Sequence, residues 1–322
     1  MKRFNRMLYV TEPSVDQDAA IARAVAIAGD HQASLTVLAV VPDTKISRQA
    51  LSAFFPDGLT NRIMAQEQQR LTDWVAPFRD RLAIHTEVRC GRTFLEVIRT
   101  VLQGGYDLVL KPAEDPAWMD RLFGGDDMHL LRKCPCPVWM LKPGDDDTCH
   151  RVATAVDFDP NDLDAGEFEL SLELLEIASA VAISDVSRLH LIHAWEAPEA
   201  GFISSWADAP DKAEMQLLEG ERERHRTATE ILKQRLAERI GNEAYQYLDP
   251  KVHLVMGQPQ HAIPMAVREI QADLLVMGTV GRSGVAGLIM GNTAEMILNQ
   301  VTCSVLAIKP SGFVSPVPSD TP

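Results

Sequence analysis

The sequence predicts an α/β protein of two tandem, doubly wound domains, each built on a parallel β-sheet. Three observations lead to this prediction. The chain has 322 residues, enough for two domains of ordinary size, and 46% hydrophobic with 24% charged residues is typical of globular proteins. It contains an internal repeat with an offset of about 166 residues. Within each repeat, short apolar runs alternate with stretches of helical periodicity, as in parallel α/β sheets.

Two pairs of matching segments define the repeat. The first repeat contains YDLVLK at Tyr106–Lys111 and CPVWMLKP at Cys136–Pro143, and the second contains ADLLVM at Ala272–Met277 and CSVLAIKP at Cys303–Pro310. The polar run PGDDDT at residues 143–148 separates the repeats. We therefore expect one domain at residues 1–145 and a second at 146–310. Residues 311–322 are rich in Pro and Ser, so we expect a disordered tail.

Each repeat contains five short apolar runs that predict strands. In the first repeat they are Met7–Thr11, Leu35–Val41, Ala83–Val88, Asp107–Lys111 and Pro137–Lys142, and in the second Val152–Val156, Leu189–Trp195, Val252–Met256, Asp273–Gly278 and Ser304–Lys309. Consecutive apolar residues indicate strands buried on both faces. The intervening helices of the second repeat are expected at Phe168–Ile183, Met215–Ile240, His261–Ile270 and Thr293–Asn299. Right-handed crossovers through such helices make the strands parallel.

Charge and cysteine content exclude several classes of protein. The net charge is -14, and after Thr148 the chain carries 13 basic against 25 acidic residues, which opposes general nucleic-acid binding. The longest apolar runs are too short to span a bilayer, and the N-terminal stretch lacks the features of a signal peptide. Five Cys argue against a disulfide framework and favour a reducing cytoplasm.

The connection from Met277 to the last helix is the most informative segment for function. Gly278 and Gly281 allow a tight turn at the carboxyl end of the sheet, where open parallel sheets bind ligands. Gly291 opens the helix, and the amides of Asn292 and Thr293 are suited to hold a phosphate. Asp157, at the end of the first strand of this repeat, is placed to take an adenine or ribose, together with the backbone of Ala155 and Ala194.

Two alternatives compete with a ligand site in this segment. The glycines are also typical of a tight strand–helix connection that holds no ligand. Asn292 and Glu295 have the spacing of a capping box, in which the Asn side chain caps its own helix. In that case the helix N-terminus offers a weaker anion site.

The arrangement strand, Gly-x2-Gly-x9-Gly, helix and Cys-Ser-Val-Leu strand resembles the C-terminal signature of universal stress proteins. The resemblance covers the chain apart from the tail, and two tandem units resemble the two-domain members of that family. It implies a five-stranded, adenine nucleotide alpha hydrolase-like sheet per domain, two domains related by a pseudo-twofold axis, and a cytoplasmic stress-response role. Family members divide into ATP binders and non-binders. Binders have Ser or Thr directly after the last Gly, where this chain has Asn292.

The first repeat lacks this machinery. Pro112 stands at the position of Gly278, Asp115 at that of Gly281, and Glu12 at that of Asp157. Gly124 is followed by Gly125-Asp126-Asp127, and carboxylates in a first helical turn repel a phosphate. We therefore expect a nucleotide, ATP bridged by Mg²⁺, in the second repeat only.

No catalytic signature accompanies this site. The sequence has neither a GxxxxGK[ST] P-loop nor a GxSxG nucleophile elbow, so we expect a binding and signalling module and not an enzyme, with weak ATP hydrolysis left open. The alternatives are a structural, partner-binding stress protein and a binder of another small ligand such as a lipid. Edge strands Val138–Leu141 and Val305–Ile308 are expected to pair within the chain, leaving other surfaces for a homodimer.

Metal ligation is not expected at the clustered Cys and His residues. Cys134-x-Cys136 has no further donors nearby, and Cys136 matches the solitary Cys303 of the second repeat. His190 and His193 face opposite sides of one strand, so they are poorly placed to share a metal, and we expect His193 to pack near the end of the sheet.

Overall fold

The computed structural model describes residues 4–43, 59–114, 125–146, 148–280 and 290–319. These residues form two compact units. Unit 1 comprises 149–280 and 291–301, and unit 2 comprises the described part of the first repeat with residues 290 and 302–319. Each repeat supplies five strands, as predicted, and every one overlaps its expected range.

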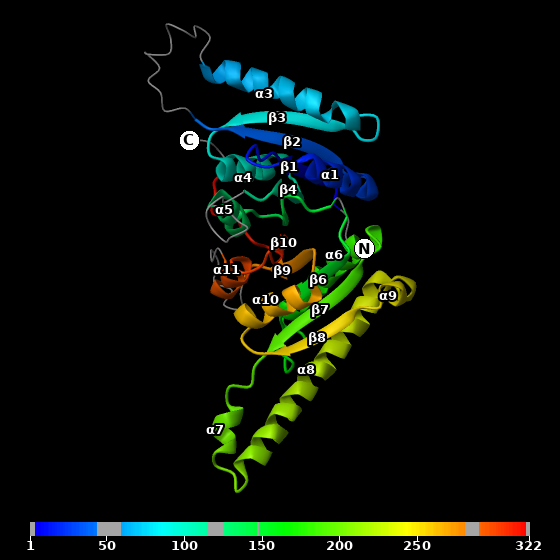
Figure 1. Ribbon diagram of the computed structural model, residues 1–322, viewed down its shortest axis with the longest axis vertical. Helices are drawn as coiled ribbons and strands as arrows, with labels where there is room; N and C mark the ends of the chain where they lie inside the picture. Colours follow the sequence, from blue (N-terminus) through cyan, green and yellow to red (C-terminus); the bar gives the residue numbers. More distant parts are fainter. Residues whose placement is uncertain (1–3, 44–58, 115–124, 147, 281–289, 320–322) are drawn as a thin grey trace. The chain divides into compact units, whose positions relative to one another are not determined.

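Unit 2 contains a six-stranded sheet in the order β3-β2-β1-β4-β5-β10 (Figure 1). Its strands are β1 (Arg6–Val10), β2 (Ser34–Val41), β3 (Ile84–Cys90), β4 (Leu108–Pro112), β5 (Val138–Leu141) and β10 (Ser304–Ile308). The first five are parallel. Its helices are α1 (Asp18–His31), α3 (Leu59–Val75), the 3-10 helix η1 (Ala76–Phe78), α4 (Thr93–Gly104) and α5 (Gly125–Lys133).

The last strand of the chain joins the sheet of unit 2. β10 pairs antiparallel with β5, with Leu306 opposite Trp139. Ser304 Oγ also accepts a hydrogen bond of 2.9 Å from the Lys142 amide. The predicted pairing of the two terminal strands is therefore confirmed. The strand of the second repeat completes the sheet of the unit that carries the first.

Unit 1 contains four parallel strands in the order β9-β6-β7-β8. They are β6 (Arg151–Val156), β7 (Arg188–Trp195), β8 (Lys251–Met256) and β9 (Leu274–Gly278). The helices are α6 (Gly166–Ser184), α7 (Ala200–Ser204), α8 (Pro210–Ile240), α9 (Asn242–Leu248), α10 (Pro259–Ile270) and α11 (Asn292–Leu298). The short α7 lies in the connection between β7 and α8.

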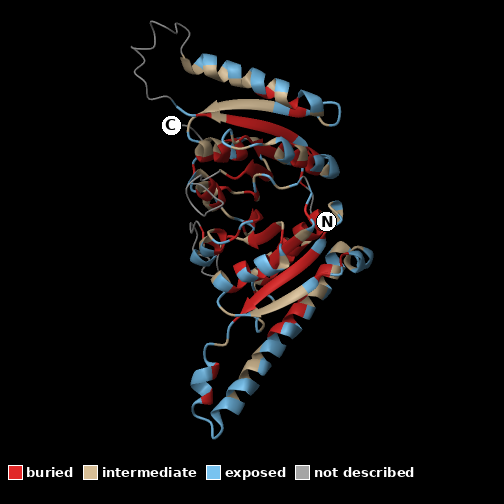
Figure 2. Cartoon of the chain, in the orientation of Figure 1, coloured by how far each residue is buried: buried red, intermediate tan, exposed pale blue. Residues whose placement is uncertain are grey.

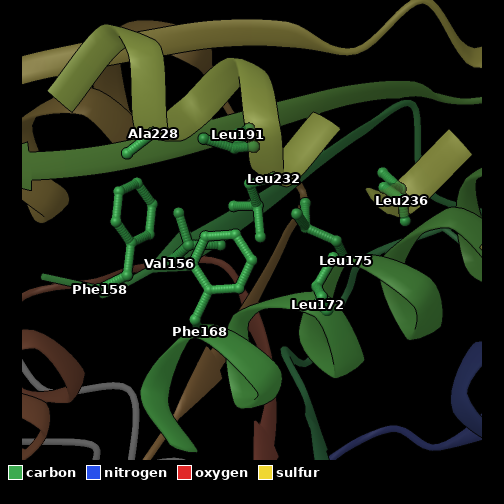
Figure 3. Packing of buried hydrophobic residues seen from close by; sticks show 9 residues of the cluster. All are labelled: Val156, Phe158, Phe168, Leu172, Leu175, Leu191, Ala228, Leu232 and Leu236. Carbon is green, nitrogen blue, oxygen red and sulfur yellow. The ribbon is translucent and has the colours of Figure 1, made fainter. Parts of the chain in front are cut away.

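The core of unit 1 forms where α6 and α8 pack on the sheet. Figure 2 shows the buried strands, and Figure 3 the cluster of apolar side chains between strands and helices. The cluster comprises Val156, Phe158, Phe168, Leu172, Leu175, Leu191, Ala228, Leu232 and Leu236. It holds the C-terminal part of α8 against the ends of β6 and β7, which positions the site described below.

The composition of the tail predicted disorder, whereas residues within 311–319 contact unit 2 in the structure. Ser315 Oγ donates a 2.7 Å hydrogen bond to the Lys133 carbonyl at the end of α5. Val317 is buried, and Gln103 Nε2 donates to the Ser319 carbonyl at 2.9 Å. The composition of the tail is poor in core-forming residues, but helix ends of unit 2 provide fixed hydrogen-bonding partners. Tertiary contacts therefore outweigh the compositional tendency to disorder.

Two truncations on α8 test the core. Leu232→Ala removes a fully buried side chain and leaves a cavity, so we expect the free energy of unfolding to fall by about 2–5 kcal/mol. Met215→Ala is the matched control on the same helix, because Met215 is 71% exposed, and should change stability by less than about 0.5 kcal/mol. Urea unfolding followed by circular dichroism measures both. Equal losses would contradict the packing of α8.

Candidate functional site

A cavity of about 740 Å³ lies in unit 1 at the carboxyl ends of its parallel strands. β6, β7 and β9 end there, and α11 begins there. Crossover connections leave this end of a parallel sheet open, because successive helices turn away to opposite faces. The cavity therefore occupies the position at which proteins of this architecture bind ligands.

Eight of the nine site residues predicted from the sequence line this one cavity. They are Ala155, Asp157, Ala194, Met277, Gly278, Gly291, Asn292 and Thr293. The ninth, Gly281, lies outside the described residues, as do Asp115 and Gly124 of the first repeat. Strand register brings the set together, because Ala155 pairs with Met277 of β9 and with Ile192 of β7. Residues more than a hundred positions apart in the chain thus meet at one end of the sheet.

The N-terminus of α11 differs from the predicted capping box. Gly291 is the N-cap, in extended conformation, and Asn292 is the first helical residue. The Gly291 amide donates to the Thr279 carbonyl at 3.0 Å, and its carbonyl accepts from the Glu295 amide at 3.1 Å. Because a glycine cap has no side chain, no side-chain oxygen of the N-cap covers the first amides of the helix. The prediction that Asn292 caps this helix is wrong.

The sequence did not indicate the histidine pair in the cavity wall. His193 stacks on Phe158 with ring centroids 4.0 Å apart and an interplanar angle of 8°. Its Nδ1 lies 3.2 Å from the Val156 carbonyl, and its Nε2 lies 2.8 Å from Nδ1 of His225 on α8. A carbonyl oxygen only accepts, so Nδ1 of neutral His193 is the donor, and its Nε2 accepts a hydrogen bond from Nδ1–H of His225.

Both histidines line the cavity, and His225 also faces the ring of Trp195 at 5.6 Å. His193 is buried near the end of the sheet, as expected. The sequence gives no signal for His225, because this residue lies in a charged helical stretch without any local motif. On the other face of β7, His190 Nδ1 lies 2.9 Å from His253 Nε2. No group of three metal-ligating side chains occurs within the described part of the chain.

Carboxylates dominate the charge of the cavity lining. Among the described lining residues there are five carboxylates and neither Lys nor Arg. The five are Asp157, Asp159, Glu167, Glu196 and Glu221. An anionic ligand in such a cavity needs a cation to accompany it, because unscreened like charges repel strongly in a partly enclosed site.

In unit 2, the corresponding end of the sheet is filled by an ion network. The ammonium of Lys111 is 1% exposed and lies 2.8 Å from Glu12 Oε2 and 2.8 Å from Asp127 Oδ1. It also donates to the Pro112 carbonyl at 3.1 Å. Burial alone would lower the pKa of Lys111, but attraction to Asp127 and Glu12 outweighs burial, so its pKa is raised.

The repeat shows what each member of this network replaces. Lys111 stands at the position of Met277, Glu12 at that of Asp157, and Asp127 at that of Ala294. In the last of these pairs, the residue of unit 1 is Ala294, which is apolar and lines the cavity. The chain's own ammonium and carboxylates therefore occupy this position in unit 2.

The chain is a two-unit, doubly wound α/β protein with a cavity at the strand ends of one unit. The family model "Universal stress protein family" matches residues 3–142 and 162–309. The chain therefore belongs to the universal stress protein family.

Full-length relatives and solved structures agree with this assignment. Universal stress protein E of Escherichia coli K12 is 29% identical over 330 residues, covering 99% of this chain and 98% of that protein. Universal stress protein E of Salmonella typhi is 30% identical, with 99% of both chains covered. A Pseudomonas aeruginosa PAO1 structure of unknown function has a TM-score of 0.70 at 24% identity, covering 96% of this chain and 94% of that chain. A universal stress protein from Archaeoglobus fulgidus has a TM-score of 0.58 at 19% identity, covering 95% and 98%. These two structures show the shared fold.

No helix in the described ranges is long and apolar enough to cross a membrane.

The ion network of unit 2 makes a stability prediction. Lys111→Met leaves the buried Asp127 carboxylate without its cation, so we expect the free energy of unfolding to fall by about 3–5 kcal/mol. The double variant Lys111→Met/Asp127→Ala copies Met277 and Ala294 of unit 1 and removes both charges. It should recover most of that loss. Urea unfolding of the three proteins checks this, and a double variant as unstable as the single one would contradict it.

A second prediction concerns pH. Burial raises the pKa of Glu114 to about 7, and repulsion from Asp127 adds to the shift. Below its ordinary pKa of 4.5, the Glu114 side chain is protonated in both the folded and the unfolded chain. As pH rises from there to about 7, the unfolded chain ionises first, so this group's contribution to stability is lost. The pKa of Glu12 is lowered, so its carboxylate stabilises the folded chain above its ordinary pKa. This contribution is lost as the pH falls through the acid range.

The test is to measure the unfolding free energy at about pH 5 and about pH 8. In Glu114→Gln the side chain is neutral throughout, so the variant should lose less stability across this interval than the wild type. Because the substitution leaves the Lys111 ion pairs in place, it separates the titration of Glu114 from that of the network. Identical changes in both proteins would be inconsistent with the proposed titration.

Proposed function

We propose that this protein is a ligand-binding module of the stress response whose unit 1 binds one adenine nucleotide, as its Mg²⁺ complex, in the cavity described above. Unit 2 binds none. One observation carries the proposal. Eight residues chosen from sequence for nucleotide binding line a single cavity of about 740 Å³ in a chain of the universal stress protein family. A cavity of this size is in the usual range for small-molecule sites.

The lining suggests which end of the ligand lies where. The backbone of Gly278, at the end of β9, and of Asn292 and Thr293, at the start of α11, offers amide donors that suit phosphates. Asp157 and the backbone of Ala155 and Ala194 lie at the ends of β6 and β7, where the base and ribose would be received. Mg²⁺ offsets the repulsion between the phosphates and the cavity carboxylates, and we expect weak binding without it.

We propose a binding role and not a catalytic one. The sequence has neither a P-loop nor a nucleophile elbow. A cytoplasmic location agrees with the cysteines, all five of which lie in the described part of the chain and none of which is in a disulfide. The carboxylates around the cavity disfavour an acyl chain as ligand. A homodimer remains part of the proposal.

Calorimetry with Mg-ATP tests the site. Wild type should bind one nucleotide per chain. Thr293→Asp places a carboxylate in the first turn of α11, as Asp126 does in the first repeat, and should weaken binding at least tenfold, about 1.4 kcal/mol. Thr293 is exposed, so the fold should tolerate the change, and Thr293→Ser is the matched control that should bind like wild type.

Two further variants come from the repeat. Gly281→Asp, which copies Asp115, should abolish binding, and Pro112→Gly in unit 2 should change nothing. Absence of heat with wild type would contradict the nucleotide proposal and favour the non-binding alternative. Native mass spectrometry of the purified protein would then identify a different ligand, if one is retained.

A further inference from the structure

A long helical hairpin, formed by α7 and the N-terminal part of α8, projects from unit 1 beyond its core cluster. α8 has 31 residues, and all of its buried residues lie at or after His225. The preceding 15 residues, about 20 Å of helix, pack mainly against the short α7. Figures 1 and 2 show this part extending away from the sheet of unit 1, mostly exposed and without buried residues. A solvated helix of this length contributes little to folding stability.

The tip of the hairpin carries large apolar side chains that face solvent. Phe202 is 70% exposed, Trp206 80% and Met215 71%, with Ile203 beside them half exposed. Phe202 and Trp206 are four residues apart, and their rings form an edge contact with centroids 6.3 Å apart. We call these four residues the apolar tip. Exposed aromatic residues grouped in this way mark interaction surfaces, and Trp is a typical anchor of protein interfaces.

Acidic residues flank the apolar tip in the sequence of the hairpin. Glu199, Asp208, Asp211 and Glu214 lie within the hairpin, with Lys212 as the basic residue among them. An anionic membrane would be repelled by this charge. A symmetric contact between two copies would bring the same acidic groups together, because a twofold interface is self-facing. A basic protein surface complements both the charge and the apolar residues.

We propose that the apolar tip is a docking surface for a different protein, whose apolar groove receives Phe202 and Trp206 and whose rim carries Lys or Arg opposite Asp208, Asp211 and Glu214. The mode is that of a short helix in a groove, with anchors one turn apart. It is independent of the proposed nucleotide, since the cavity lining and the apolar tip share no residue.

Site-specific photo-crosslinking in the cells that make the protein identifies the occupant. The full chain carries a benzophenone amino acid in place of Phe202, or in place of Tyr247 as the matched exposed control on α9. We expect one discrete adduct with a different protein at position 202 and none at 247. The adduct should disappear in Trp206→Ser and in Asp208→Asn/Asp211→Asn/Glu214→Gln.

Binding of the purified partner then gives the decisive measurement. Each variant should raise the Kd for the partner at least tenfold. Raising the salt concentration from about 0.05 M to about 0.5 M should raise the Kd of the wild-type complex by at least the same factor. Since the substituted residues are exposed, thermal midpoints and Mg-ATP binding should be unchanged, which separates this proposal from the nucleotide site.

Four outcomes would overturn the proposal. An adduct between two copies of this chain would assign the tip to self-association. Flotation of wild type but not Trp206→Ser with phosphatidylglycerol–phosphatidylethanolamine vesicles would assign it to membranes. No adduct at position 202, or a partner whose affinity is indifferent to the acidic residues, would remove the docking surface altogether.

Discussion

Parallel strands that end together leave a crevice at their carboxyl ends, and each repeat of this chain must fill or solvate it. Unit 2 fills the position with Lys111, whose ammonium is paired at 2.8 Å with both Glu12 and Asp127. Unit 1 has Met277 at that position and retains a cavity of about 740 Å³. At this position the two units therefore differ by a buried ammonium in unit 2 and an apolar side chain in unit 1. Such a charge is stable only with both partners in place.

The charge of the open cavity then limits which ligand it accepts. Five carboxylates line it, without Lys or Arg among the described lining residues. A polyphosphate enters such a site favourably only with a divalent cation, which is why we couple the proposed nucleotide to Mg²⁺. The amides at the start of α11 favour the same end of the cavity for phosphate. Backbone donors suit this site because they add no further side-chain charge.

His225 connects the cavity with the rest of α8. It is the first buried residue of that helix, it lines the cavity, and its Nδ1 lies 2.8 Å from His193. The exposed hairpin begins on its N-terminal side. The packing core around Leu232 and Phe168 holds the helix on its C-terminal side (Figure 3). This side chain thus lies where the cavity, the hydrophobic core and the exposed part of α8 meet.

The sequence by itself determined the two repeats, all ten strands, the family and eight of the residues that line the cavity. These features depend on local patterns: apolar runs report burial, glycines report tight turns, and the two repeats allow position-by-position comparison. The strand ends that carry Asp157, Ala194 and Gly278 were therefore predictable, because a parallel sheet brings such ends together.

Only the tertiary structure decided the remaining features. Lys111 lies 99 residues from Glu12 in sequence, and His225 lies 32 residues from His193. The order of the tail likewise depends on the carbonyl of Lys133, 182 residues away from Ser315. No local pattern encodes these pairs, because each forms when elements distant in the chain pack together and bring two particular side chains within hydrogen-bonding distance. The N-cap of α11 is Gly291 because the backbone turns into the helix there. The spacing of Asn292 and Glu295 carries no information about that turn, so the sequence alone did not locate the first helical residue.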